Sequence, residues 1–275
     1  MESDTESWAE EIRSSEADDP ITNVKSEQDI AEGKFTYSRF ISLLQSLGID
    51  HRSVRANSFG MPIGRGKYFS VYRHTVSAID YQSMWLSISG ARHQLFQRPV
   101  LRPNTYVAIK RVNVNEETGE VDISDQRKLF AMCREITTLL HPTLRDHDSI
   151  IKLQAIIWEN GFGTGYENGP PLWPSLVMEY CDMTLADYQL RNPLTPLQSA
   201  TIGHKIGDGL DALHSANIFH GDLKSENVLL KIKKCGALEP KLADFGCSIT
   251  FLDREGKAKY YIAGTKPWCA PEVST

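Results

Sequence analysis

Residues 220–227 read HGDLKSEN, and this octapeptide is the most informative part of the chain. It supplies a carboxylate at Asp222, a cation at Lys224 and an amide at Asn227, which together offer a base, a charge-neutralising group and a metal ligand. The tripeptide Asp244-Phe245-Gly246 follows behind the strand-like segment KLA. A carboxylate at a strand end, followed by glycine, suits a metal ligand on a movable loop. Taken alone, each stretch is equally typical of a polar turn.

Motifs further upstream fit the same chemistry. The segment IGRGKYFSV at 63–71 places Gly64 and Gly66 in a turn whose backbone N–H groups could approach phosphate oxygens. VAIK at 107–110 ends on Lys110, whose amine must leave the core or find an anion. Glu135 lies at the edge of the apolar stripe of a predicted helix over 124–141, from which it could reach that lysine. Singly, these features also suit an ordinary hairpin turn, a surface lysine and a solvated glutamate.

The order of the motifs is what makes them specific. VAIK, HxDLKxxN, DFG and, at 270–272, APE resemble the ordered motif set of the eukaryotic protein kinases. The resemblance covers residues 54–275, about four fifths of the chain. Within that family, DLKSEN and the later Gly264-Thr265 resemble the Ser/Thr branch rather than the tyrosine branch.

The resemblance implies a catalytic role for each matching residue. Asp222 would orient the substrate hydroxyl and accept its proton, and Lys224 would balance charge on the moving phosphoryl group. Asn227 and Asp244 would hold Mg²⁺ between phosphoryl oxygens. Lys110 would hold the α- and β-phosphates of ATP and pair with Glu135.

The same resemblance implies a nucleotide site. Gly64 and Gly66 would cover the phosphates. Glu179 and Cys181, after a gatekeeper-like Met178, would offer backbone groups to adenine. The nucleotide site would be completed by Ile63, Val71, Ala108 and Leu229, and a spine linking two lobes would consist of Leu139, Leu153, His220 and Phe245.

The resemblance implies an α+β, two-lobed fold of protein-kinase type, with a β-rich N-lobe containing one key helix and an incomplete helical C-lobe. The change from β-like to helical patterns along the chain agrees with it. Residues 1–34 are expected to form an acidic disordered tail, and residues 35–53 an amphipathic helix and linker. The N-lobe is expected at 54–178, with an insertion at about 77–104, and the truncated C-lobe at 179–275. A long helix is predicted to begin at Thr195-Pro196 although it contains three glycines.

Composition narrows the class of protein. With 41% hydrophobic and 24% charged residues and no long apolar run, the chain is typical of a soluble globular protein without a membrane span. Its five cysteines form no CxxC pair, which argues against a disulfide framework or a zinc site. They favour a reducing compartment, so a cytoplasmic location is expected and a nuclear one stays open.

Three departures from the family pattern bear on activity. Phe69 stands at the third glycine of the phosphate loop, a change that working kinases tolerate. Gly221 replaces the arginine that reads a phosphate on the activation loop, so loop phosphorylation is not expected to be the main switch. The sequence ends three residues after Glu272, where the family continues with further helices.

The sequence therefore predicts an ATP-dependent kinase that transfers the γ-phosphoryl group of Mg-ATP to Ser/Thr hydroxyls of protein substrates. The alternative is a catalytically impaired, pseudokinase-like fragment that binds nucleotide or acts as a scaffold. Expected partners are ATP, Mg²⁺ and a protein substrate, with no membrane and no nucleic acid beyond the nucleotide. The sequence does not set the oligomeric state.

Overall fold

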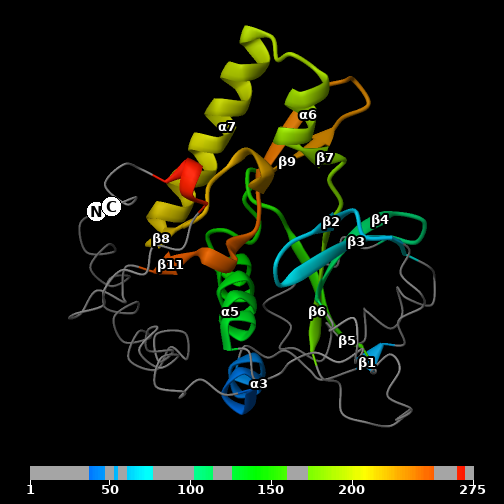
Figure 1. The fold of residues 1–275 in the computed structure, drawn as a ribbon, viewed down its shortest axis with the longest axis vertical. Helices are drawn as coiled ribbons and strands as arrows, with labels where there is room; N and C mark the ends of the chain where they lie inside the picture. Colours follow the sequence, from blue (N-terminus) through cyan, green and yellow to red (C-terminus); the bar gives the residue numbers. More distant parts are fainter. Residues whose placement is uncertain are drawn as a thin grey trace, which may run out of the picture.

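The computed structural model describes residues 37–46, 53–54, 61–76, 102–113, 126–159, 173–250 and 265–269. The described part has a sheet lobe, in the lower half of Figure 1, and a helical lobe, in the upper half. This arrangement confirms the predicted α+β, two-lobed fold. The predicted acidic tail at 1–34 and nearly all of the predicted insertion at 77–104 lie outside the described residues.

A six-stranded sheet forms the sheet lobe, in the order β1-β5-β6-β4-β3-β2. The strands are β1 Ser53–Val54, β2 Gly64–Arg65, β3 Phe69–Thr75, β4 Tyr106–Val112, β5 Leu153–Glu159 and β6 Pro174–Glu179. Neighbours pair antiparallel, except that β1 runs parallel to β5. The four longest strands are rich in β-branched and aromatic residues, which suit a pleated, half-buried surface.

Helix α5 (Gln126–Leu140) is the longest helix among the described residues of this lobe. Its apolar stripe is buried as the helical spacing predicts, and consists of Leu129, Met132, Cys133, Ile136, Leu139 and Leu140. Helix α3 (Tyr37–Ser46) contacts α5 and buries Phe40 and Leu44 completely. Trp173, just before β6, lies with its ring centroid 6.1 Å from those of both Tyr37 and Phe40. The predicted amphipathic helix therefore packs onto the sheet lobe.

In the part of the chain that the structure describes, the helical lobe contains two α-helices, three 3-10 helices and several short strands. Its elements are β7 Met183–Thr184, α6 Leu185–Arg191, α7 Pro196–Ser215, β8 Ile218–Phe219, η1 Ser225–Asn227, β9 Val228–Ile232, β10 Leu238–Leu242, η2 Phe245–Cys247, β11 Ile249–Thr250 and η4 Lys266–Trp268. β10, β9 and β7 form one antiparallel sheet, and β11 pairs antiparallel with β8.

Helix α7 begins where the sequence predicts. Thr195 accepts a hydrogen bond from the backbone N–H of Gln198, whose side chain accepts one from the N–H of Thr195, and Pro196 occupies the first turn. Close packing against β10 explains why residue 209 is glycine, because a Cβ there would lie 2.9 Å from Cδ1 of Leu242. Within the described ranges, the other two glycines of α7 meet nothing within 4 Å.

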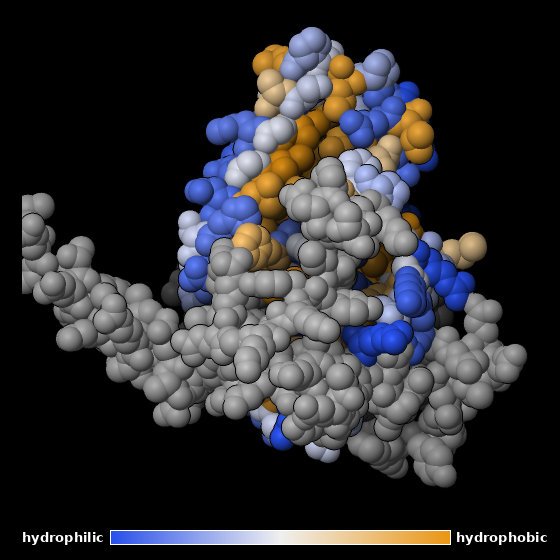
Figure 2. Space-filling model, turned by 60° about the vertical axis from the view of Figure 1, so that its left-hand side comes forward, coloured by the Kyte–Doolittle hydropathy of each residue, from blue (hydrophilic) through white to orange (hydrophobic). Residues whose placement is uncertain are grey.

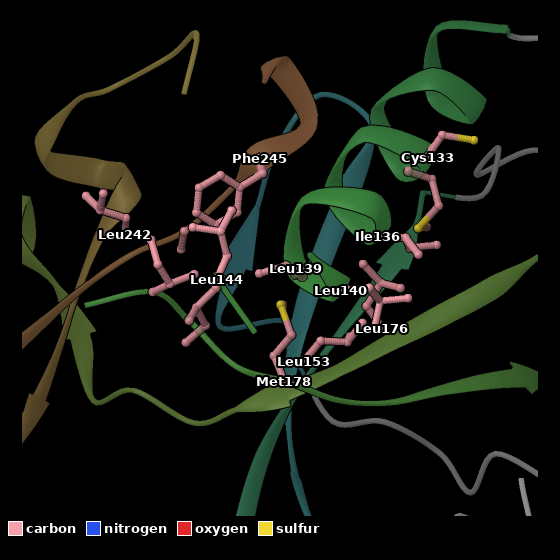
Figure 3. Close-up of a cluster of buried hydrophobic side chains, with 14 of the residues drawn as sticks. Cys133, Ile136, Leu139, Leu140, Leu144, Leu153, Leu176, Met178, Leu242 and Phe245 are labelled. Carbon is pink, nitrogen blue, oxygen red and sulfur yellow. The ribbon is translucent and has the colours of Figure 1, made fainter. Parts of the chain in front are cut away.

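A shared apolar core joins the lobes. Figure 3 shows Phe245 in one buried cluster with Leu139, Leu153 and Met178. Phe245 is completely buried, and its ring lies 5.0 Å from that of His220, which is 3% exposed. The predicted spine residues are therefore all buried near one another.

The surface of the helical lobe is partly apolar. Figure 2 shows a strip of hydrophobic side chains bordered by hydrophilic ones. Leu190 and Leu197 are among the exposed apolar residues of this lobe. No helix in the described part of the chain is both long enough and apolar enough to cross a membrane.

Candidate active site

Lys110 lies on β4, an interior strand, between Val71 of β3 and Leu176 of β6. It is 6% exposed, a costly position for an ammonium group without a partner. Two carboxylates meet it: Nζ lies 2.5 Å from Oε2 of Glu135 and 2.9 Å from Oδ1 of Asp244. The predicted lysine–glutamate pair is present, and the structure adds Asp244 to it.

Electrostatics keep this lysine charged. Burial alone would lower the pKa of Lys110, but the carboxylates of Glu135 and Asp244 outweigh burial and raise it. The Lys110 ammonium holds the pKa of Asp244 below its ordinary value. Burial raises the pKa of Glu135, and Lys110 offsets that effect only in part. The cluster joins three elements that are far apart in sequence: β4, α5 and the segment before η2.

The glycine-containing loop lies next to this lysine. β2 pairs with β3, and the backbone N–H of Gly66 donates to the carbonyl of Phe69 across the turn. Gly64 and Gly66 are both exposed. Nζ of Lys110 lies 5.1 Å from the centroid of the Phe69 ring, a cation–π distance. The residue that replaces the third glycine thus packs against the lysine.

Asp222 lies at the centre of a hydrogen-bonded cluster. Oδ2 accepts from Nζ of Lys224 at 2.7 Å and from Nδ2 of Asn227 at 3.1 Å. Oδ1 accepts from the backbone N–H of Thr265 at 2.9 Å and from its hydroxyl at 2.8 Å. Lys224 also donates to the Thr265 hydroxyl at 2.7 Å. The carboxylate is held in one orientation, as a positioned base requires.

The preceding histidine supports this loop. Nε2 of His220 donates to the carbonyl of Ala243 at 3.0 Å, while Nδ1 accepts from the N–H of Asp222 at 3.4 Å. These partners specify a neutral ring with the proton on Nε2. Burial lowers the pKa of His220, which favours the same neutral form. His220 therefore ties Asp222 to the segment that leads into Asp244.

Asn227 and Asp244 offer oxygen atoms that suit a metal ion. Nδ2 of Asn227 donates to the backbone carbonyl of Asp222 at 2.7 Å, which leaves the amide oxygen as a ligand. Asp244 binds Lys110 through Oδ1, and its side chain is 53% exposed. Its backbone is left-handed, with φ 63° and ψ 67°. Hard oxygen donors of this kind are what Mg²⁺ prefers, so the two residues fit that ion.

The residues predicted to contact adenine lie in or next to strands of both lobes. Met178 pairs with Ala108 in the sheet and is buried. Cys181 is also buried, and the same hydrophobic cluster includes Val71 and Leu229. Ile63 is 54% exposed and pairs through its N–H with the carbonyl of Val71. Four of these residues thus come from β3, β4, β6 and β9, whereas Ile63 directly precedes β2 and Cys181 follows β6.

Comparison with known proteins decides the family. The model of the protein kinase domain matches residues 97–274, about two thirds of the chain. The chain belongs to the protein kinase family. This kinase is 30% identical over 187 residues to serine/threonine-protein kinase pakA of Talaromyces marneffei, 32% over 173 residues to serine/threonine-protein kinase ste20 of Aspergillus fumigatus, and 27% over 209 residues to human serine/threonine-protein kinase 10.

These matches cover much of the chain and little of the relatives. They include 68%, 62% and 74% of this kinase, but only 25%, 18% and 19% of the three relatives. The chain therefore spans a quarter or less of each of them. The family match begins after the glycine-containing loop and after α3.

The structure also identifies residues of this kinase that the motifs did not. The Thr265 hydroxyl donates a hydrogen bond directly to Asp222. The Gly264-Thr265 pair was the only feature of the sequence that pointed to Thr265 as a residue of the site. Lys241 is 3% exposed and lies 3.3 Å from Oε1 of Glu179. Glu179, expected to act through its backbone, thus also has a bound side chain. A lysine inside the apolar segment before DFG could have signalled this pair.

Proposed function

We propose that this chain is an ATP-dependent protein kinase that transfers the γ-phosphoryl group of Mg-ATP to Ser/Thr hydroxyls of proteins. The observation that carries the proposal is the cluster in which Lys110 binds both Glu135 and Asp244. Phosphoryl transfer needs placement and charge neutralisation more than covalent help. This cluster supplies a buried cation and a metal-ligating carboxylate from separate segments in one place.

The remaining roles follow from the geometry around Asp222. Its carboxylate, held by Thr265 and Asn227, would orient the acceptor hydroxyl and take its proton. Lys224, 2.7 Å from it, would neutralise charge on the transferred group. Asn227 and Asp244 would hold Mg²⁺, which when bound neutralises phosphate charge. Among the described residues, no group of three or more His, Cys, Asp or Glu could hold a metal ion, so the nucleotide would supply further ligands.

The first test is nucleotide binding. Mg-ATP should stabilise the folded chain by about 2.7 kcal/mol at a hundredfold excess over Kd, because only the folded state binds it. The measurement is a thermal shift for the wild-type chain and for Lys110→Ala, with Lys234→Ala on the exposed β9–β10 turn as a matched control. Loss of the shift in Lys110→Ala alone supports the proposal. A well-folded wild type without any nucleotide-dependent shift would refute it.

The second test separates catalysis from binding. Asp222→Asn should lower transfer to a generic Ser/Thr substrate by about 10²–10⁴-fold and leave Mg-ATP binding intact. Wild-type turnover in this variant would show that the base is wrongly assigned. Nucleotide binding without transfer in the wild-type chain would favour the alternative of a non-catalytic binding module. We also propose a protein substrate as partner and a reducing location, the cytoplasm or nucleus, which suits the free cysteines.

A further inference from the structure

Asn113 is the first residue after β4, three positions beyond Lys110. It makes three hydrogen bonds to the loop that connects β2 and β3, and one to Ser70 on β3. Its backbone N–H donates to the carbonyl of Tyr68 at 2.8 Å, and its side-chain Nδ2 donates to the carbonyls of Gly66 at 2.9 Å and Lys67 at 3.3 Å. Its Oδ1 accepts from the hydroxyl of Ser70 at 2.6 Å. One residue thus holds three consecutive carbonyls at the loop tip.

The orientation of the amide follows from these partners. Nδ2 faces two carbonyl oxygens, which can only accept, and Oδ1 faces a hydroxyl, which can donate. Turning the amide over would place Oδ1 against the carbonyls of Gly66 and Lys67. Ser70 is 5% exposed, so its hydroxyl is a fixed, desolvated donor that holds the amide in place. The arrangement is specific for asparagine, because aspartate could replace the acceptor but not the donor.

We propose that Asn113 is a positioning residue that holds the phosphate-covering loop in register with Lys110. The inference rests on the proposed function, in which that loop covers the phosphates of ATP. Because Asn113 continues the strand that carries Lys110, its bonds fix the loop tip relative to the lysine. With the tip carbonyls bound to Asn113, the exposed glycines are pre-organised and less ordering is required when nucleotide binds.

A purely structural role makes a different forecast. A residue that only closes the β2–β3 turn should change stability and affect all ligands alike. A residue that places the phosphate-covering loop should matter for ligands that carry phosphates and not for adenosine. The two roles are therefore separable by comparing Mg-ATP with adenosine.

The experiment uses the full chain with Asn113→Ala, Asn113→Asp and Ser70→Ala, and with Asn192→Ala, at the exposed end of α6, as the matched control. Amide hydrogen exchange of residues 63–70 is measured without nucleotide, and affinities are measured for Mg-ATP and for adenosine. A thermal melt identifies any variant that fails to fold, and Asn113→Asp, which preserves size and the Ser70 bond, is then the variant that decides.

Asn113→Ala and Asn113→Asp should both speed exchange in the loop and weaken Mg-ATP binding by roughly tenfold, the scale of one lost hydrogen bond plus loop ordering. Adenosine binding should stay unchanged, and Asn192→Ala should match the wild type throughout. Unchanged loop exchange in both Asn113 variants would overturn the inference, as would an equal loss for Mg-ATP and adenosine. Absence of Mg-ATP binding by the wild type would instead refute the proposed function.

Discussion

Gly221 occupies a position where a side chain has no room. Its φ is +78°, and a Cβ built there would lie 2.0 Å from the carbonyl oxygen of Cys247 and 2.9 Å from the carbonyl carbon. Gly236, on the turn between β9 and β10, has nearly the same backbone, with φ +81°, but nothing lies within 4 Å of its Cβ position. Comparing an alanine substitution at Gly221 with one at Gly236 therefore separates the free-energy cost of the left-handed backbone from the cost of the steric clash.

The expected losses follow from these numbers. An alanine in the left-handed region costs about 1–2 kcal/mol, and this term is common to both sites. Carbon–oxygen contacts are normally about 3.3 Å or more, so Gly221→Ala must also move the Cys247 carbonyl by about 1 Å. Overpacking of this kind costs about 1–3 kcal/mol. We therefore expect a loss of about 1–2 kcal/mol for Gly236→Ala and about 2–5 kcal/mol for Gly221→Ala.

The assay is urea unfolding of both variants, followed by phosphotransfer under conditions in which each is folded. Gly221→Ala should also lower transfer, because it pushes the loop of Asp222 away from the segment after DFG, whereas Gly236→Ala should not. Gly221→Arg, which restores the residue usual in the family motif, should meet the same clash. Equal stability losses at Gly221 and Gly236, with equal activities, would refute this reasoning.

Three further predictions rest on single contacts. Because burial lowers the pKa of His220, the unfolded chain binds more protons than the folded chain below about pH 6.5, so the free energy of unfolding should fall as the pH drops through that range. Urea melts at several pH values should show a weaker fall for His220→Phe, and an identical pH profile for the two proteins would contradict the neutral, buried assignment of His220. Phe40→Ala should cost about 3–5 kcal/mol, since this α3 side chain is completely buried and its ring lies next to that of Trp173, whereas the exposed Ser42→Ala should cost little. A loss under about 1 kcal/mol for Phe40→Ala would show that α3 does not pack as described. The buried hydroxyls of Thr138 and Ser248 lie 2.9 Å apart, so Thr138→Val should cost about 1–3 kcal/mol by leaving the Ser248 hydroxyl without this partner. In a double-mutant cycle, adding Ser248→Ala should recover part of that loss, and strictly additive losses would show that the two hydroxyls are not coupled.

Local sequence patterns predicted many of the helices and strands of this fold. The apolar stripe of α5, the Thr195-Pro196 start of α7 and the β-rich segments were all predictable, because helix period, capping and strand propensity depend on neighbouring residues. The motif residues around Lys110 and Asp222 could be proposed as site residues for a different reason. Their chemistry requires particular side chains in a particular order, and that order is visible in the sequence.

Contacts between distant segments were decided only by the tertiary structure. Nothing near Asn113 in the chain indicates that it binds the loop of Gly66, 47 residues away. The bond between Thr265 and Asp222 and the approach of Gly221 to Cys247 are of the same kind. Periodicity and spacing constrain a residue's own helix or strand, but which atoms meet across the fold depends on how all the elements pack at once. The sequence by itself determined which residues are candidates for the proposed chemistry, and the packing determined which contacts hold those residues in place.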